Sequence, residues 1–177
     1  MKKIISTLVV IAVLLAACSN SKQNKIDKIK ELEKIVSSKT DTFNIKKANE
    51  LVEAYVDFAD AFPKDTMAAP CYYKAASILM NTGDPNKAVE LFDKIINNYP
   101  DYKKLPDCMF MKAFTYDNFL QNKKKAEECY NAFIKKYPDN EFADDAKSLL
   151  EMLNKTPEEI AAELDAKLKA DTVKKSE

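Results

Sequence analysis

Residues 72–100 read YYKAASILMNTGDPNKAVELFDKIINNYP, a pattern typical of two helices joined by a tight turn. Small and apolar residues recur three and four positions apart on both sides of the turn, as they do along one face of a helix. Asp84 is a favoured helix N-cap and Pro85 fits a first helical turn, so the second helix is expected to begin there. Because Pro100 cannot continue a helix, the pair Tyr99-Pro100 should end it. The stretch predicts a helical hairpin.

The aromatic-proline ending recurs along the chain. Phe62-Pro63, Tyr99-Pro100 and Tyr137-Pro138 follow one another at intervals of 37 and 38 residues, and Ala88 and Ala126 each lie twelve residues before the last two prolines. Self-similarity at such a period indicates stacked helical hairpins. The sequence therefore predicts an all-α fold of about three antiparallel hairpins, followed by C-terminal helices.

The hairpin pattern resembles that of the tetratricopeptide repeat (TPR) family, whose large, small and aromatic positions follow a fixed order. The first central unit matches that order without a gap at Tyr72, Ala75, Ala76, Leu79, Ala88, Phe92, Ile95 and Pro100. The second matches, with one extra residue in its turn, at Met109, Ala113, Tyr116, Ala126, Tyr130, Phe133 and Pro138. The resemblance implies a short TPR superhelix over residues 26–154, with more divergent outer units.

The outer units carry weaker signals of the same kind. Ile29, Leu32 and Val36 mark the first helix of an earlier unit, whose turn is expected at residues 37–47. Ala146, Leu149, Leu150 and Leu153 indicate the first helix of a closing unit. Thr156 and Glu159 form a capping-box pattern that begins a last helix with Ile160, Leu164 and Leu168 on one face. Residues 155–177 are thus predicted to be a C-terminal helix with a frayed tail.

TPR proteins generally hold a partner segment on the exposed faces of their first helices. Carried over residue by residue, the resemblance assigns a partner-binding groove to Tyr73, Ser77, Met80, Phe110, Phe114 and Asp117. An aromatic groove of this kind suits an extended or helical peptide with apolar side chains. The other interpretation places Phe110 or Phe114 in the core, because a register change of one residue exchanges the faces of a helix.

The N-terminus has the pattern of an export signal. Lys2 and Lys3 precede the apolar stretch from Ile4 to Ala17, which is too short for a comfortable membrane span. Leu15-Ala16-Ala17-Cys18 resembles the lipobox of bacterial lipoproteins, which implies that residues 1–17 are removed and that Cys18 carries the lipid. An ordinary cleaved signal with an incidental cysteine is the alternative. Residues 18–25 would then be the lipidated cysteine and a polar tether.

Composition removes most catalytic chemistry. The chain has no His, Arg or Trp and one Gly, so it lacks an imidazole base, a guanidinium fork and a glycine-rich phosphate loop. Its 28 basic and 28 acidic residues balance, which argues against nucleic-acid binding. We expect no enzyme activity, no cofactor and no metal site.

Three cysteines remain beyond Cys18, and we interpret them as buried, unreactive thiols. Cys71 and Cys108 occupy equivalent positions in successive repeats, so they should lie about a helix diameter apart, 8–10 Å, beyond the reach of an unstrained disulfide. Cys129 is the third, and an odd count leaves at least one thiol unpaired.

The resemblance to TPR lipoproteins implies a scaffold anchored by lipid. Similar proteins work with the outer-membrane β-barrel assembly machine and with the Tol–Pal system, and Ser19 after the lipidated cysteine implies the outer membrane. The predicted protein faces the periplasm and binds envelope proteins or peptide segments, although display on the cell surface stays open. The alternative function is a periplasmic lipoprotein that binds a small molecule or glycan in the same groove.

Overall fold

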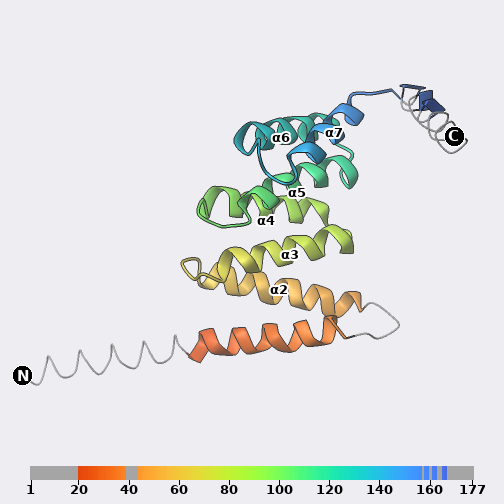
Figure 1. The fold of residues 1–177 in the computed structure, drawn as a ribbon. Helices are drawn as coiled ribbons and strands as arrows, with labels where there is room; N and C mark the ends of the chain where they lie inside the picture. Colours follow the sequence, from red (N-terminus) through yellow and green to blue (C-terminus); the bar gives the residue numbers. More distant parts are fainter. Residues whose placement is uncertain (1–19, 39–43, 157, 160, 163–164, 167–177) are drawn as a thin grey trace, which may run out of the picture. The chain divides into compact units, whose positions relative to one another are not determined.

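A computed structural model describes residues 20–38, 44–156, 158–159, 161–162 and 165–166 (Figure 1). The fold is all-α, as predicted, and the described residues contain no strand. An N-terminal helix covers residues 20–36. It is followed by α2 (Ile45–Ala61), α3 (Ala68–Thr82), α4 (Pro85–Asn98), α5 (Leu105–Asn118), α6 (Lys123–Lys136) and α7 (Ala143–Leu153). The chain divides into two compact units, unit 1 up to Leu105 and unit 2 from Pro106.

Unit 1 is a series of antiparallel helices in which each packs on the next. Figure 1 shows the N-terminal helix, α2, α3 and α4 lying side by side, and α3 contacts both α2 and α4. Ala75, Ala76 and Ala88 are fully buried between these helices. Helix axes approach closely where side chains are small, and the larger buried rings of Phe58 and Phe92 fill the spaces beside them. Small residues at the predicted repeat positions therefore set the hairpin spacing.

Unit 2 has its own core, built from α5, α6 and α7. The buried residues are Phe110, Ala113, Ala126, Tyr130, Phe133 and Ala146, and the half-buried Leu149, Leu150 and Leu153 of α7 pack against them. The helix predicted around Ala146, Leu149, Leu150 and Leu153 is thus confirmed, and its apolar residues complete this core.

Three helices end at an aromatic residue in the same way. Phe62, Tyr99 and Tyr137 have φ of −129°, −130° and −134° and ψ of 60°, 63° and 61°. Each donates its backbone N–H to the carbonyl four residues earlier, that of Phe58, Ile95 or Phe133. The proline that follows has no N–H to extend the ladder. The predicted aromatic-proline helix ends are confirmed at all three positions.

The turns after these prolines share one hydrogen-bond pattern. The N–H of the third residue after the aromatic donates back to the aromatic's carbonyl, at 2.9, 3.0 and 3.2 Å in the three turns. That third residue, which is Asp65, Tyr102 or Asn140, then accepts from the N–H three residues further on, at 3.0, 2.8 and 2.9 Å. The turns of unit 1 occupy residues 62–67 and 99–104, and we call them the proline turns.

Helix starts also follow the predicted caps. Pro85 is the first residue of α4, and the Asp84 side chain accepts a hydrogen bond from the Lys87 N–H at 3.1 Å. At the C-terminal capping box, the Thr156 N–H donates to Glu159 at 2.8 Å and the Glu159 N–H donates to the Thr156 hydroxyl at 3.2 Å. Ile160, Leu164 and Leu168 of the expected last helix lie outside the described residues.

The N-terminal helix begins earlier than predicted. Residues 20–25, interpreted from their polar composition as a tether, are helical, so that prediction is wrong for them. The Gln23 side chain donates to Asp27 one turn on, at 2.8 Å, and Lys22 forms an ion pair with Asp65 of the first proline turn. These polar side chains thus support the helix. The predicted turn at residues 37–47 is also shorter, because Asn44 caps α2 and the helix begins at Ile45.

Two polar bridges each join three consecutive helices of unit 1. The Tyr55 hydroxyl of α2 donates to Glu33 of the N-terminal helix at 2.5 Å, and Lys74 of α3 binds the same carboxylate at 2.6 Å. One helix further on, Tyr72 donates to Asp60 and Lys94 binds Asp60 at 2.9 Å.

Each lysine of the two bridges also lies over the tyrosine ring of its own bridge. The distance from nitrogen to ring centre is 5.5 Å in the first bridge and 5.0 Å in the second. The repeated bridges hold each helix of unit 1 at a defined position along its neighbours.

The second bridge predicts a loss of stability in acid. Burial alone would raise the pKa of Asp60, but the hydrogen bonds from Tyr72 and Lys94 outweigh it and hold this pKa below its ordinary value of 3.8. A lowered folded-state pKa contributes stability that is present above the unfolded-state pKa and is lost as pH falls through the folded one. The Asp60→Asn variant should therefore lose less of its unfolding free energy than the unaltered chain as pH falls below about 4.

The measurement is urea unfolding at pH 7 and at a series of acidic pH values. At pH 7 the Asp60→Asn cost should be no more than about 1 kcal/mol, since the pair is half exposed. Tyr72→Phe removes only the hydroxyl donor and should reproduce part of the reduced acid sensitivity. Parallel acid curves for the variant and the unaltered chain would contradict the assignment.

Candidate functional site

In unit 1 the predicted groove residues lie on α3 at different depths. Tyr73 is half-buried, with its ring edge-on to Phe92 and to Tyr102 at 6.4 Å each. Ser77 is half-buried and its hydroxyl donates to the Tyr73 carbonyl at 2.9 Å. Met80 is 4% exposed. Tyr73 and Ser77 thus present part of their surface, whereas Met80 presents almost none.

In unit 2 the two predicted groove phenylalanines differ in role. Phe110 is 9% exposed and belongs to the core, with its ring 5.0 Å from Phe142 and 5.8 Å from Phe133. Phe114, one helical turn on, is half-buried; its ring is stacked with that of Phe110 and edge-on to that of Phe119. Of the two interpretations left open by the sequence, the core position describes Phe110.

Asp117 lies at the end of α5 and is turned toward α6. Its carboxylate accepts a hydrogen bond from the Tyr130 hydroxyl at 3.4 Å. Burial raises the pKa of Asp117, which the hydrogen bond from Tyr130 and the charge of Lys123 partly offset. This carboxylate therefore joins two helices of unit 2 in addition to any role at the surface.

Two segments of the chain match the tetratricopeptide repeat family, residues 71–102 and residues 107–140. They are the two central units whose hairpins, aromatic-proline ends and buried alanines are described above. Over these segments the chain is similar to TPR proteins. No curated protein matches the chain significantly. TPR repeats generally mediate protein–protein interaction and scaffolding.

A hollow lies at the edge of unit 1 rather than on the predicted groove face. It has a volume of about 730 Å³ and lies between the two proline turns. Pro63, Tyr99 and Pro100 form apolar walls, and Lys64 and Lys103 stand at its exposed rim. Asp65, Thr66, Ala69, Asn98, Asp101 and Tyr102 complete the lining. The 37-residue interval between the two prolines was the signal in the sequence that could have placed these turns at one edge.

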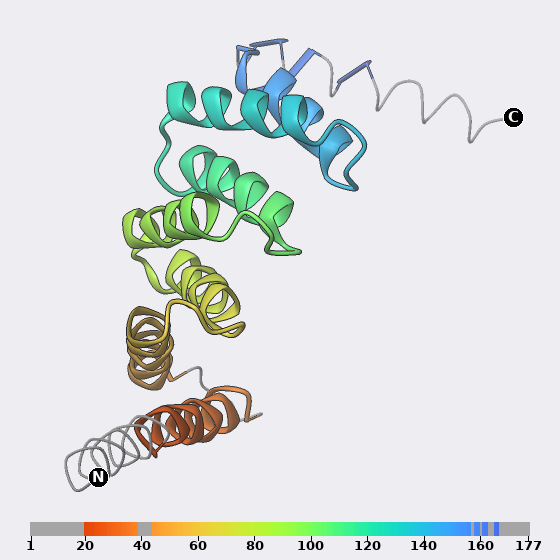
Figure 2. The same cartoon turned by 90° about the vertical axis from the view of Figure 1, so that its left-hand side faces the viewer.

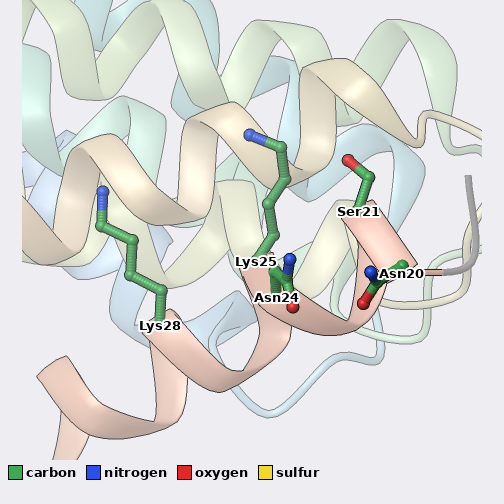
Figure 3. A pocket seen from close by; sticks show the side chains of 5 residues that line it. All are labelled: Asn20, Ser21, Asn24, Lys25 and Lys28. Atoms are coloured by element: carbon green, nitrogen blue, oxygen red, sulfur yellow. The ribbon is translucent and has the colours of Figure 1, made fainter. Parts of the chain in front are cut away.

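A second, more open depression of about 500 Å³ lies on the N-terminal helix. Asn20, Ser21, Asn24, Lys25 and Lys28 line it, and Figure 3 shows the two lysines extending in the same direction from the helix. Lys25 lies 3.9 Å from Asp57 of α2, a long ion pair. The start of this helix is therefore polar and basic.

The cysteines of the repeats are thiols held in the packing. Cys71 and Cys108 are buried and Cys129 is half-buried, and none of the three is in a disulfide. Burial raises the pKa of the Cys71 thiol to about 11, which keeps it protonated at neutral pH. The predicted burial is confirmed for Cys71 and Cys108.

The described part of the chain contains no group of three or more Cys, Asp or Glu placed to hold a metal ion. Within the same residues, every helix is too short or too polar to cross a bilayer.

The different burial of the two phenylalanines of α5 gives a prediction for stability. Phe110→Ala should lower the unfolding free energy by about 3–5 kcal/mol, because it empties a site in the unit 2 core. Phe114→Ala should cost less, about 1–2 kcal/mol, because its ring keeps part of its surface in water. Urea unfolding followed by circular dichroism measures both. Equal costs for the two variants would contradict the assignment of Phe110 alone to the core.

Proposed function

We propose that this protein is a lipid-anchored TPR scaffold that faces the periplasm and binds partner proteins in cell-envelope or outer-membrane assembly. The observation that carries the proposal is the presence, in one chain, of TPR repeats and of the sequence Leu15-Ala16-Ala17-Cys18. The repeats would provide a surface for partner binding, and the lipid on the cysteine would attach that surface to the membrane.

The repeats support the scaffold part of the proposal. Their helices are held in register by capped ends, buried alanines and repeated polar bridges, so a partner meets a preformed surface. Preorganisation reduces the ordering cost of binding. Within unit 1 the accessible part of that surface includes Tyr73 and Ser77, and within unit 2 it includes Phe114. A partner segment with apolar side chains would bind such half-buried rings.

The N-terminal sequence supports the anchor. A basic start, a short apolar stretch and small residues before a cysteine form an export signal. Stable attachment to a bilayer needs more than one acyl chain, and lipoprotein modification provides several. Asn20, the first helical residue described, lies only two positions after Cys18. The folded repeats would thus begin directly at the membrane surface, without a long linker.

Binding of a small molecule or glycan in the groove has less support. Met80 and Phe110 are buried, and the Tyr73 ring packs against Phe92 and Tyr102. Few aromatic faces of the predicted groove are thus available for a sugar ring to stack on.

Replacement of Cys18 tests the anchor. Cys18→Ala should leave a folded protein of precursor length that carries no lipid, because the site of both modification and cleavage is gone. Intact mass and incorporation of labelled palmitate measure this. Cys129→Ala is the matched control and should be processed and labelled normally. Normal processing and membrane retention of Cys18→Ala would show that the chain is not a lipoprotein.

Capture of a partner tests the scaffold. After chemical crosslinking and gentle detergent extraction, the protein should migrate with other envelope proteins, and Tyr73→Ala or Phe114→Ala should reduce the amount captured by about tenfold. The half-buried Ile78, on α3, provides a control position through Ile78→Ala. Migration alone under these conditions, together with a higher melting temperature in the presence of a glycan, would favour the small-ligand function instead.

A further inference from the structure

We infer that the proline-turn edge of unit 1 docks on the membrane surface, and that the hollow between the two turns binds the phosphate-bearing headgroup of an anionic phospholipid. The inference rests on the proposed lipid anchor, and it adds a second, non-covalent contact with the bilayer.

The start of the N-terminal helix lies at the same edge as the two proline turns. In Figure 1 all three stand at the left-hand side of unit 1, the side that faces the viewer in Figure 2. The ion pair between Lys22 and Asp65 joins the first helical turn directly to a residue that lines the hollow. The helix that follows the proposed anchor is therefore attached to the wall of the hollow.

Chain length then places the proposed lipid close to this edge. Cys18 precedes Lys22 by four residues, and four residues span at most about 14 Å. A bilayer that holds the acyl chains of Cys18 must consequently lie near Asp65, whatever path the intervening residues take. The opposite edge of unit 1 lies a full helix length away.

The charges at this edge are complementary to a phosphate surface. Lys64 and Lys103 are exposed at the rim, and among the described residues neither forms an ion pair. Asp65 is already compensated by the hydrogen bond and charge of Lys22, which lower its pKa. Asp101 is the remaining carboxylate of the lining. Each lysine near an anionic bilayer contributes about 1 kcal/mol of attraction.

The basic start of the N-terminal helix extends this charge. Lys25 and Lys28 line the open depression of Figure 3, seven and ten residues beyond Cys18. They continue the positive charge of Lys22 along the same helix, three and six residues further on.

The walls of the hollow also suit the interface between water and lipid. Tyr99 and Tyr102 combine an apolar ring with a hydroxyl group, and such side chains gather at headgroup depth. The volume of about 730 Å³ is that of a small-molecule site, large enough for a headgroup and its glycerol.

The opposite edge of unit 1 has different chemistry. Its hollow, of about 280 Å³, is lined by Glu53, Asp84 and Lys87, so carboxylates outnumber lysines there. An anionic headgroup would be repelled more than attracted at that hollow. The charge difference between the two hollows agrees with the position of Cys18.

Hydrogen exchange on the full-length protein tests the inference. The protein is reconstituted in vesicles of phosphatidylcholine alone or mixed equally with phosphatidylglycerol. We expect backbone N–H exchange at Lys64, Thr66, Asp101 and Lys103 to slow by about fivefold or more only in the anionic vesicles, and the effect to weaken at high salt. Lys64→Glu combined with Lys103→Glu should abolish the slowing. Lys46→Glu combined with Lys87→Glu makes the same charge change at the opposite edge, and this variant should still show the slower exchange in anionic vesicles.

Two further controls are needed. One distinguishes a phospholipid headgroup from free phosphate, and the other distinguishes failure of the docking inference from failure of the proposed anchor. Equal slowing by inorganic phosphate in neutral vesicles would assign a general anion site and overturn the inference, as would slowing produced only by a co-purified protein. The intact mass of the same sample shows whether Cys18 carries the lipid. A lipidated protein without the phosphatidylglycerol effect overturns the docking inference alone, whereas the effect in an unlipidated protein supports docking and overturns the proposed anchor.

Discussion

The aromatic-proline helix end is the constraint on which the described structure depends. A proline has no N–H and its ring occupies the space of the preceding turn, so the helix stops before it, and the last helical residue lies two positions ahead of the proline. Phe62, Tyr99 and Tyr137 respond with nearly the same φ and ψ and the same hydrogen bond to a carbonyl four residues back. Because each stop is alike, each chain reversal is alike, and the next helix starts in the same register.

This constraint explains why the repeats tolerate so much sequence variation. Once the ends are fixed, packing needs only small residues at the crossing points and rings beside them. Ala88 and Ala126 are both fully buried, and each lies twelve residues before the proline that follows its helix. The residues on the outer faces of the helices can then vary, and they are available to form polar bridges or to bind partners.

The features that could be predicted from the sequence are those determined within one or two turns of helix. The Asp84 cap, the three aromatic ends and the Thr156–Glu159 capping box depend on residues a few positions apart, so they can be recognised without a structure. The helix at residues 20–25 is supported by the local hydrogen bond from Gln23 to Asp27 and also by the ion pair of Lys22 with Asp65, more than forty positions away. The polar composition of residues 20–25 alone does not reveal that contact.

The candidate site shows the same division. The repeat pattern placed Tyr73 and Phe110 on equivalent faces, but Phe110 is 9% exposed, with the rings of Phe142 and Phe133 at 5.0 and 5.8 Å, whereas Tyr73 is half-buried and its ring contacts lie at 6.4 Å. The hollow between the proline turns likewise arises from two segments 37 residues apart. Depth and cavities follow from which elements become neighbours, and residue spacing within one hairpin does not contain that information.

Lysine is the only basic residue type in the chain, and its compact charge fits both roles that unit 1 gives it. In the bridges, Lys74 and Lys94 each serve one carboxylate and one tyrosine face, which a point charge on a flexible stem can do at once. At the proline-turn edge, Lys64 and Lys103 lack such partners among the described residues and retain their charge for an external anion. With the proposed lipid on Cys18, the short connection through a helix attached to Asp65 would restrict how unit 1 can tilt, because the acyl chains and the rim lysines would both favour one edge toward the bilayer. Orientation would thus follow from the combination of a lipid, a rigid helix and two uncompensated charges, where a flexible tether would leave unit 1 free to turn.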